Sequence, residues 1–247
     1  MSKNYQNLAM RAIKPFSLCA LVLTLTAPVQ TLNAEELNLQ PYKASYTAYK
    51  WGDDVGEANI ELSKLNENQY SLIYTSKVSK FFLSDKRSEH SIFLVHDNEV
   101  VPSQYFYTRT GTGPDKELKV SFSSEGKGAI SVDGNQAFEW NGEYDNQIYR
   151  LDLAKQLAGG KKSLTYDFVN YRGELRQYGV EVIADETLAL PFGSIEAVKV
   201  KLIRDSKKRE TFAWFAPSLN YALVRLQQFK EGDEQGDIKL KSFEILE

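Results

Sequence analysis

Residues 42–48 read Tyr-Lys-Ala-Ser-Tyr-Thr-Ala, and the same alternation of apolar and polar side chains returns at residues 58–62, Ala-Asn-Ile-Glu-Leu, and at residues 70–76. In an extended chain, successive side chains point to opposite faces, so an apolar period of two predicts strands with one buried face. Turn-forming residues separate the three stretches at 52–54 and at 66–68. We therefore predict a meander of three antiparallel strands at the start of the fold.

This pattern continues along the rest of the chain, and Gly, Asn, Asp and Pro residues interrupt it at short intervals. Roughly a dozen strands call for a strongly curved antiparallel sheet, either a partly open barrel or a two-layer sandwich, because closure or stacking buries the apolar face and protects the edges. The expected fold is mainly β. The further strands are predicted at 89–95, 100–108, 117–122, 129–132, 136–140, 163–169, 175–183, 194–204, 209–215, 221–229 and 237–246.

One segment departs from the strand pattern. From Asp145 onward, apolar residues recur at helical spacing, and Gly159-Gly160 supplies a stop signal at the end of this stretch. Asp145 is a good N-cap residue. We predict a single helix at about 145–158, which either crosses one end of the sheet or plugs a half-open barrel. The apolar positions on its expected face are Ile148, Leu151, Ala154 and Leu157.

The first 34 residues have the composition of a secretory signal peptide. Their charges are all basic, an apolar run covers 16–29, and Ala34 precedes the acidic Glu35. We predict cleavage between Ala34 and Glu35, which leaves 35–247 as a single β-rich periplasmic domain.

Two alternative readings of the leader are less favourable. A membrane-spanning anchor needs about 20 consecutive apolar residues, but polar residues and Pro28 interrupt this run. A lipoprotein signal needs a cysteine at the cleavage point, whereas Cys19 lies inside the apolar run. We therefore expect no transmembrane segment in the mature protein.

Charge and cysteine content limit the possible functions. The whole chain has a net charge of −3, and removal of the three basic residues of the leader brings the mature chain to about −6. An acidic protein is poorly suited to bind nucleic acid or anionic lipid as its main partner. Cys19 is the only cysteine, so the mature chain is expected to have neither disulfides nor thiolate metal sites.

No catalytic or metal-binding motif stands out. His90 and His96 are six residues apart in a predicted strand, which places them about 20 Å apart, too far to share a metal ion. The sequence lacks a Gly-x-Ser-x-Gly elbow that would present a nucleophilic serine. The acidic pairs 53–54 and 233–234 fall at predicted turns, where Asp commonly bonds its own backbone. We predict no catalytic residue, no metal site and no cofactor.

Aromatic and basic side chains near strand ends are the best candidates for a ligand site. Strand ends surround the mouth of a barrel or sandwich, where an aromatic ring can stack on a sugar or face an acyl chain. An arginine at such a mouth can bind an anionic headgroup. Core packing is nevertheless the favoured explanation of the aromatic residues, and an arginine also simply snorkels from a strand edge. The predicted ligand-binding residues are Trp51, Trp140, Trp214, Arg109 and Arg225.

Several short motifs follow one another in a recognisable order and spacing. They are Tyr46 and Tyr49 before Gly56-Glu57-Ala58, Pro102 near Tyr105, the Asp145 helix, Pro191-Phe192-Gly193, and Trp214-Phe215-Ala216-Pro217 followed by 221–225. Together they resemble a bacterial exported family catalogued as domain of unknown function 3108 (DUF3108). That resemblance covers nearly the whole mature chain and implies a periplasmic, mainly antiparallel β fold with no established activity. A looser similarity of fold connects the chain with the lipoprotein-carrier half-barrels of the Gram-negative periplasm.

Three classes of function remain open at this point. The favoured one is a non-enzymatic periplasmic module that binds an amphiphilic or glycan component of the envelope, such as a lipid or glycolipid, or an envelope protein. The second is a hydrolase or lyase that acts on an envelope polymer with carboxylates dispersed in the sequence. The third is a structural scaffold without a ligand. An apolar cavity would favour the first class, and two carboxylates meeting in one cleft would favour the second.

Overall fold

Strands that are neighbours in the sequence are also neighbours in the sheet. The structure is a computed structural model that describes residues 39–80, 82–206 and 208–246. These residues belong to the second of the two units into which the chain divides, 1–33 and 34–247, and only they are described below. The predicted leader, its cleavage point between Ala34 and Glu35, and Cys19 lie outside the described residues.

The first eight strands form an antiparallel meander, here called the N-terminal arm. Its strands are β1 (Tyr42–Lys50), β2 (Asp53–Lys64), β3 (Gln69–Lys80), β4 (Leu83–His96), β5 (Glu99–Gly111), β6 (Lys116–Ser123), β7 (Ala129–Val132) and β8 (Asn135–Glu139).

The remaining elements form the C-terminal arm, which contains one α-helix and one short 3₁₀ helix. The elements are β9 (Tyr144–Asp145), α1 (Tyr149–Ala158), β10 (Ser163–Val169), β11 (Leu175–Leu190), β12 (Gly193–Ile203), β13 (Arg209–Ala216), η1 (Pro217–Leu219), β14 (Ala222–Lys230) and β15 (Asp233–Ile245).

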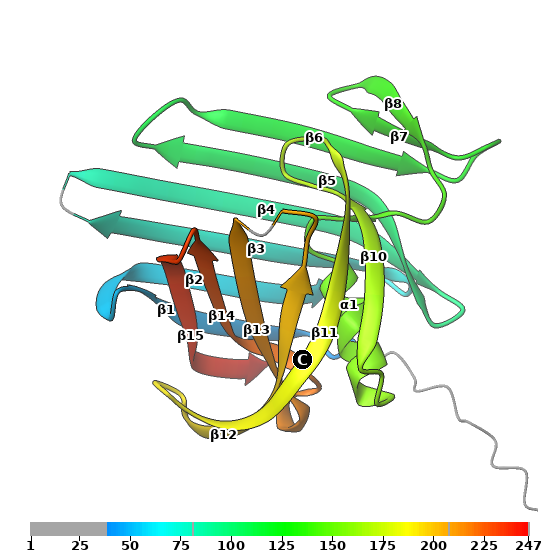
Figure 1. The fold of residues 1–247 in the computed structure, drawn as a ribbon. Helices are drawn as coiled ribbons and strands as arrows, with labels where there is room; N and C mark the ends of the chain where they lie inside the picture. Colours follow the sequence, from blue (N-terminus) through cyan, green and yellow to red (C-terminus); the bar gives the residue numbers. More distant parts are fainter. Residues whose placement is uncertain (1–38, 81, 207, 247) are drawn as a thin grey trace, which may run out of the picture. The chain divides into compact units, whose positions relative to one another are not determined.

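The two arms join where the first strand pairs with the last. β1 and β15 are antiparallel, with Tyr42 opposite Ile245 and Tyr49 opposite Asp237. This pairing produces one 15-stranded sheet in the order β8-β7-β6-β5-β4-β3-β2-β1-β15-β14-β13-β12-β11-β10-β9. The sheet curls until its arms lie on either side of α1 (Figure 1), but its edge strands β8 and β9 do not pair with each other. The predicted mainly β fold is confirmed, in its partly open form.

The apolar alternation in the sequence sets which face of the sheet is buried. Ala44, Tyr46 and Ala48 on β1 are buried, and so are Ala58 and Ile60 on β2, while their sequence neighbours are more exposed. Large and small side chains oppose each other across this pair of strands, Tyr46 facing Ala58 and Ala44 facing Ile60. Such pairs of a large and a small side chain pack closely across neighbouring strands.

The observed strands match the predicted ones in number and order apart from β9, but several are longer than predicted: β2, β4 and β15 begin earlier, at Asp53, Leu83 and Asp233. β9 is only two residues long and pairs in parallel with β10, so it leaves no periodic pattern to detect. β11 continues to Leu190, although its prediction ends at 183. Its last residues pair with β12 up to Leu190 opposite Gly193, so the hairpin partner holds them extended.

The arms also touch at the side away from the β1–β15 pair. The rings of Tyr107 on β5 and Tyr171, in the turn after β10, lie 5.3 Å apart. In the same turn Gly173 has a φ of +74°, and a Cβ atom there would lie 2.8 Å from Cγ1 of Val132 on β7. Glycine therefore permits both the turn and the close approach. Side-chain packing, rather than a ladder of hydrogen bonds, holds this side of the barrel.

The helix begins later than the sequence predicts. Asp145 is fully buried, and its Oδ1 accepts hydrogen bonds from the N–H groups of Gln147 and Ile148, at 2.9 and 3.0 Å. It thus caps the turn that leads into α1, and helical geometry starts at Tyr149. The C-terminal end is as predicted, because the N–H of Gly160 bonds the carbonyl of Leu157 in a glycine-dependent cap.

Polar contacts fix α1 between the arms. The side-chain amide of Gln147 donates to the carbonyl oxygen of Leu72 on β3 and to Oγ of Ser91 on β4, both at 2.9 Å. On the other side, the hydroxyl of Tyr166 on β10 donates to Asp152 at 2.8 Å. The helix therefore plugs the half-open barrel, one of the two placements expected from the sequence.

We predict that Tyr46→Phe destabilises the protein. The buried Tyr46 hydroxyl donates a 2.7 Å hydrogen bond to the carbonyl oxygen of Leu223 on β14, which links β1 to a strand two places away in the sheet. The substitution leaves that carbonyl without this partner, and the expected loss in free energy of unfolding is about 1–3 kcal/mol. Urea denaturation measures the loss, and an unchanged midpoint would contradict the prediction.

We also predict that Asp145→Asn alters how stability depends on pH. Burial raises the pKa of the Asp145 carboxyl to about 6, so the folded state keeps a proton that the unfolded chain releases near pH 4. The wild type should therefore lose stability as the pH rises from 4 to 6, by up to about 3 kcal/mol. Asn keeps an oxygen for the two N–H groups and does not ionise. Melting temperatures between pH 4 and 7.5 should favour the variant increasingly as the pH rises; parallel profiles would refute this role.

Candidate functional site

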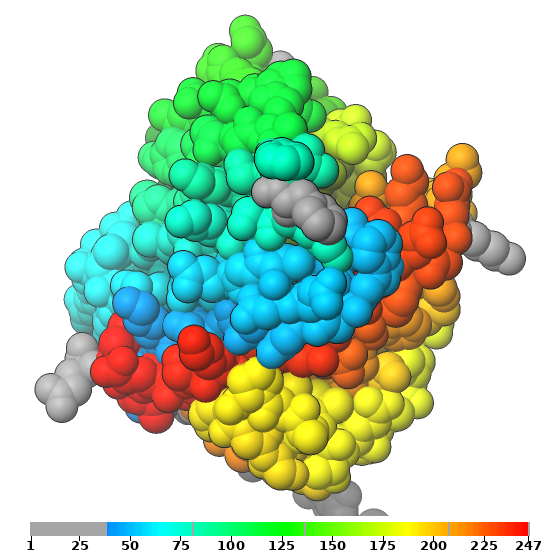
Figure 2. All heavy atoms as spheres, turned by 90° about the vertical axis from the view of Figure 1, so that its left-hand side faces the viewer, coloured from blue at the N-terminus to red at the C-terminus, as the bar shows by residue number. Residues whose placement is uncertain are grey.

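A large cavity lies inside the curled sheet, on one side of α1. Its volume is about 1000 Å³, and strands of both arms line it, together with the first residues of α1 and the turn between β10 and β11. In Figure 2, the tip of the β1–β2 hairpin (blue) lies between cyan strands of the N-terminal arm and orange strands of the C-terminal arm. Lys50 and Trp51 at this tip belong to the cavity lining.

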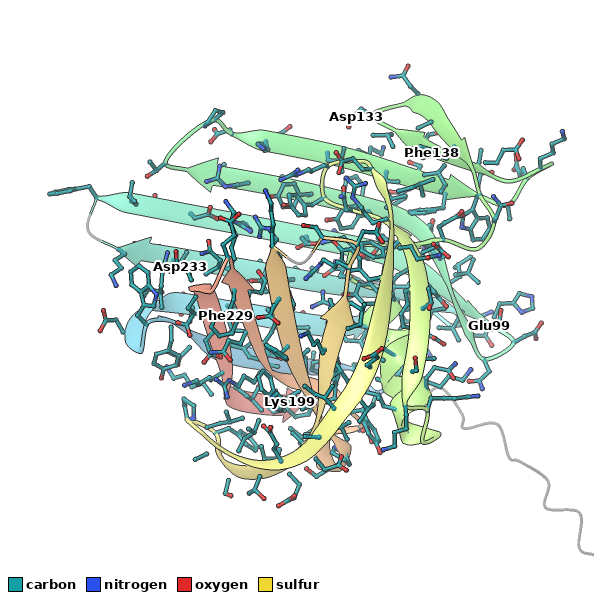
Figure 3. All side chains as sticks on the ribbon, in the orientation of Figure 1. Glu99, Asp133, Phe138, Lys199, Phe229 and Asp233 are labelled. Carbon is teal, nitrogen blue, oxygen red and sulfur yellow. The ribbon has the colours of Figure 1, made fainter. Side chains whose placement is uncertain are left out.

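A second, smaller cavity of about 520 Å³ lies on the other side of α1. Leu151 and Lys155 of the helix line it, and Lys155 donates to the carbonyl oxygen of Asn98 at the β4–β5 turn, next to Glu99. Residues that follow Asp233 on β15 line the larger cavity. Glu99 therefore marks the position of the smaller cavity and Asp233 that of the larger one, and Figure 3 shows these two residues at opposite ends of the strands. The helix thus separates two cavities, and Arg150 lines both.

Aromatic and aliphatic side chains form much of the wall of the larger cavity. Burial raises the pKa values of Tyr74 and Tyr149, so both phenols are neutral near pH 7 and present hydroxyl groups as well as ring surface. Such walls suit a ligand with a substantial apolar part and a few polar groups. The larger apolar lining residues are Tyr49, Trp51, Tyr74, Leu83, Tyr107, Tyr149, Phe168, Tyr171, Tyr178, Leu202, Leu223, Leu226 and Ile238.

The charge of the cavity lining is opposite in sign to that of the protein. The chain carries a net charge of −3, but nine basic side chains and only four acidic ones line this cavity. A concave surface of one sign within low-dielectric walls concentrates its electric field and attracts ions of the opposite sign. The basic residues are Lys50, Lys80, Arg87, Arg109, Arg150, Arg172, Arg176, Arg204 and Arg209; the acidic ones are Asp85, Glu89, Glu174 and Asp237.

Hydrogen bonds and ion pairs engage all four acidic groups. Asp85 binds Arg87 and Arg109, and although its partial burial acts to raise its pKa, these two arginines hold it below the usual value. Glu89 accepts hydrogen bonds from the Tyr105 hydroxyl and the Asn146 amide, at 2.7 and 2.6 Å. Asn170 and Arg176 bind Glu174. Arg225 and Lys239 form ion pairs with Asp237.

Histidines add no catalytic or metal-binding arrangement. His90 hydrogen-bonds the hydroxyl of Ser71 at 2.9 Å and His96 contacts Asp97 at 3.1 Å, and neither histidine lines the cavity. Within the described ranges, no three His, Cys, Asp or Glu side chains gather closely enough to hold a metal ion. None of the helices in the described part of the chain is long and apolar enough to cross a membrane.

Two of the five predicted ligand-binding residues line the larger cavity. Trp51 is 63% exposed and lies between the ammonium groups of Lys50 and Lys80, 4.8 and 4.9 Å from its ring centroid. Arg109 also lines the cavity, where it forms a 2.8 Å ion pair with Asp85.

The other three lie elsewhere. Trp214 is buried, and its indole N–H donates to Glu186 at 2.9 Å. Arg225 stacks on Trp214 at 4.5 Å and forms two hydrogen bonds with Asp237. Trp140 packs in a separate apolar cluster near β5–β7. These three residues join strands to each other in the structure.

Arg150 and Arg204, which also line the larger cavity, are not among the ligand-binding residues predicted from the sequence. A usable signal existed in the strand alternation, because Val200 and Leu202 precede Arg204 with a period of two and are both buried. A cation that continues a buried face points toward the interior. Arg150 carries a corresponding helical signal, since Leu153 and Leu157, three and seven residues after it, are both buried.

A curved antiparallel sheet around a half-open cavity places the protein among β-barrel-like proteins. It is similar to a solved β-barrel-like protein of the domain of unknown function DUF1849 from Brucella abortus, with a TM-score of 0.58, 10% sequence identity, and coverage of 85% of this chain and 99% of that chain. A protein with a YmcC-like fold from Bacteroides fragilis NCTC 9343 matches at 11% identity over 84% of this chain and 97% of that chain, with a TM-score of 0.32.

Sequence comparison identifies the family. The model of a family of proteins of unknown function, DUF3108, matches residues 41–239, so the chain belongs to the DUF3108 family. The resemblance noted in the sequence is thereby confirmed. The search of curated proteins found no match to this chain.

Proposed function

We propose that this protein is an exported, periplasmic, non-enzymatic binding protein that holds an amphiphilic component of the cell envelope in its larger cavity. The observation that carries the proposal is the cavity of about 1000 Å³ with aromatic walls and many basic groups. Its volume lies at the upper end of the range for small-molecule sites, about 300–1000 Å³, and leaves room for an acyl chain.

The engagement of the acidic groups supports binding rather than hydrolysis. A general acid needs a carboxyl with a raised pKa, placed to give a proton to the substrate. The pKa of Asp85 is lowered, as described above, and the hydrogen bond from Asn170 lowers that of Glu174. Arginines hold Asp85 and Asp237 in place. This arrangement favours the binding module over the hydrolase or lyase alternative.

The leader supports the proposed location. Its basic start, apolar run and small residue Ala34 before Glu35 are typical of a cleaved secretory signal. Mass spectrometry of the protein isolated from the periplasmic fraction should give a mature chain that begins at Glu35. Recovery of the uncleaved chain in the cytoplasm would reject the proposed export.

The proposal is tested directly with the mature protein purified from the periplasm. Native mass spectrometry should show an added mass at one-to-one stoichiometry, and solvent extraction followed by lipid analysis should identify it. A protein that carries no added mass, and binds no lipid when envelope extracts are added back, would reject tight binding of an amphiphile.

We predict that Ser76→Trp reduces the fraction of ligand-bound protein at least severalfold. Ser76 lies on β3 and lines the cavity, so an indole at this position occupies the space of the ligand. Thr75→Trp is the matched control, because Thr75 is the adjacent half-buried residue whose side chain does not line either cavity. Equal loss of the added mass in both variants would show that the cavity is not the binding site.

A further inference from the structure

We infer that the ligand of the larger cavity is an anionic amphiphile whose negatively charged headgroup binds Arg150 and Arg204. This inference rests on the proposed function, because it names the chemical class of the amphiphile that the cavity holds. Its starting point is a difference among the arginines. Arg109 and Arg225 are half-buried and paired with Asp85 and Asp237, whereas Arg150 and Arg204 are half-buried without such a partner.

Arg150 lies in the first turn of α1. Its Nε donates to the carbonyl oxygen of Gln147 at 3.1 Å, which leaves the two terminal nitrogens for other partners. No carboxylate among the described residues lies within 4.0 Å of its guanidinium group. Its charge acts on neutral phenols instead: burial raises the pKa values of Tyr42 and Tyr149, and Arg150 opposes both increases.

Arg204 follows β12 and stacks on the ring of Tyr178, with 4.5 Å between the guanidinium carbon and the ring centroid. Its Nη1 is buried without a hydrogen-bond partner. The whole guanidinium group makes neither a hydrogen bond nor an ion pair with any residue that the structure describes. Because the face of the group rests on Tyr178, its N–H donors remain for a planar or tetrahedral oxyanion at the cavity wall.

The two charges converge on the same part of the cavity. Ring contacts connect them: Tyr149, next to Arg150 in α1, stacks on Phe168 at 5.2 Å, Phe168 lies 4.8 Å from Tyr178, and Arg204 stacks on Tyr178. Both arginines also oppose the increase that burial causes in the pKa of Tyr149. All three residues line the larger cavity. Two arginines beside a phenol provide several N–H donors and an O–H donor for one anionic group.

Unpaired cations of this kind cost free energy in the empty protein. Partial removal from water weakens their solvation, and a carboxylate would be the usual compensation inside a protein. The arginine-bound carboxylates of this cavity pair with arginines other than Arg150 and Arg204. A negative charge that neutralises these two arginines would therefore come from a ligand. An anionic headgroup neutralises the two guanidinium charges, while the apolar tail of the ligand packs against the aromatic walls of the cavity. The shared chemistry is an acyl chain that ends in a carboxylate or a phosphate monoester.

The test compares charged and neutral probes with the same chain. The mature protein is titrated with a fluorescent C18 fatty acid, with its methyl ester, and with a phosphate monoester of the same fluorescent chain. We expect at least one of the two anionic probes to bind about tenfold or more tightly than the ester. The stronger of the two identifies carboxylate or phosphate as the preferred headgroup.

Variants assign that preference to the two arginines. Arg150→Gln and Arg204→Gln should each weaken binding of the preferred anionic probe about tenfold and leave binding of the methyl ester unchanged, which also verifies that the cavity is intact. Lys241→Gln is the control for net charge, because Lys241 is exposed and lines neither cavity. It should bind all probes as the wild type does. Should a glutamine variant fail to fold, Arg→Lys replaces it and should weaken binding of the anion by loss of the two-pronged contact.

The possible failures are distinguishable. If the ester binds the wild type as tightly as both anions do, or if the arginine variants bind the anions normally, the inference is wrong while amphiphile binding stands. If no probe binds the wild type, the proposed cavity for acyl chains is itself rejected, and the inference falls with it.

Discussion

The antiparallel pairing of β1 with β15 is the constraint on which the rest of the structure depends. It joins the two ends of the described chain, so a meander that could have formed two separate sheets becomes one sheet of 15 strands. Strands in a sheet twist relative to one another by about 20–25°, and a long twisted sheet curls. The arms of this sheet therefore approach each other across α1, with the edge strands left unpaired and the barrel left partly open.

The incomplete closure has a chemical consequence. Side chains fill the barrel where α1, Gln147 and the Tyr107–Tyr171 contact hold the arms, and cavities remain on either side of the helix. Inside the larger one, burial raises the pKa values of Tyr74 and Tyr149, while nine lysines and arginines supply positive charge. Carboxylates neutralise some of these arginines but not Arg150 and Arg204, so the interior combines an apolar surface with uncompensated positive charge. A protein with a net negative charge thus contains a site that attracts anions.

Sequence reasoning predicted most of the fold because the signals it uses are local. An apolar period of two identifies each long strand, and Gly159-Gly160 marks the end of α1. The start of α1 was misplaced because a buried Asp can cap a turn as well as a helix, and Asp145 does the former. The two residues of β9 are extended because β10 lies beside them, which no local pattern records.

The sequence by itself determined the class of fold, the buried face of each long strand, the single helix and the family, since these follow from spacing along the chain. Only the tertiary structure decided which strand ends surround the cavity and which charges find partners there. The register of β13 and β14 places Trp214 opposite Arg225, where the guanidinium group stacks on the indole, and neither residue lines the larger cavity. Arg150 and Arg204 come from different elements and line the same cavity because the sheet curls around the helix. The apolar period in a sequence indicates to which face of its strand or helix a side chain points. A binding site depends instead on the distances between residues that are remote in the chain.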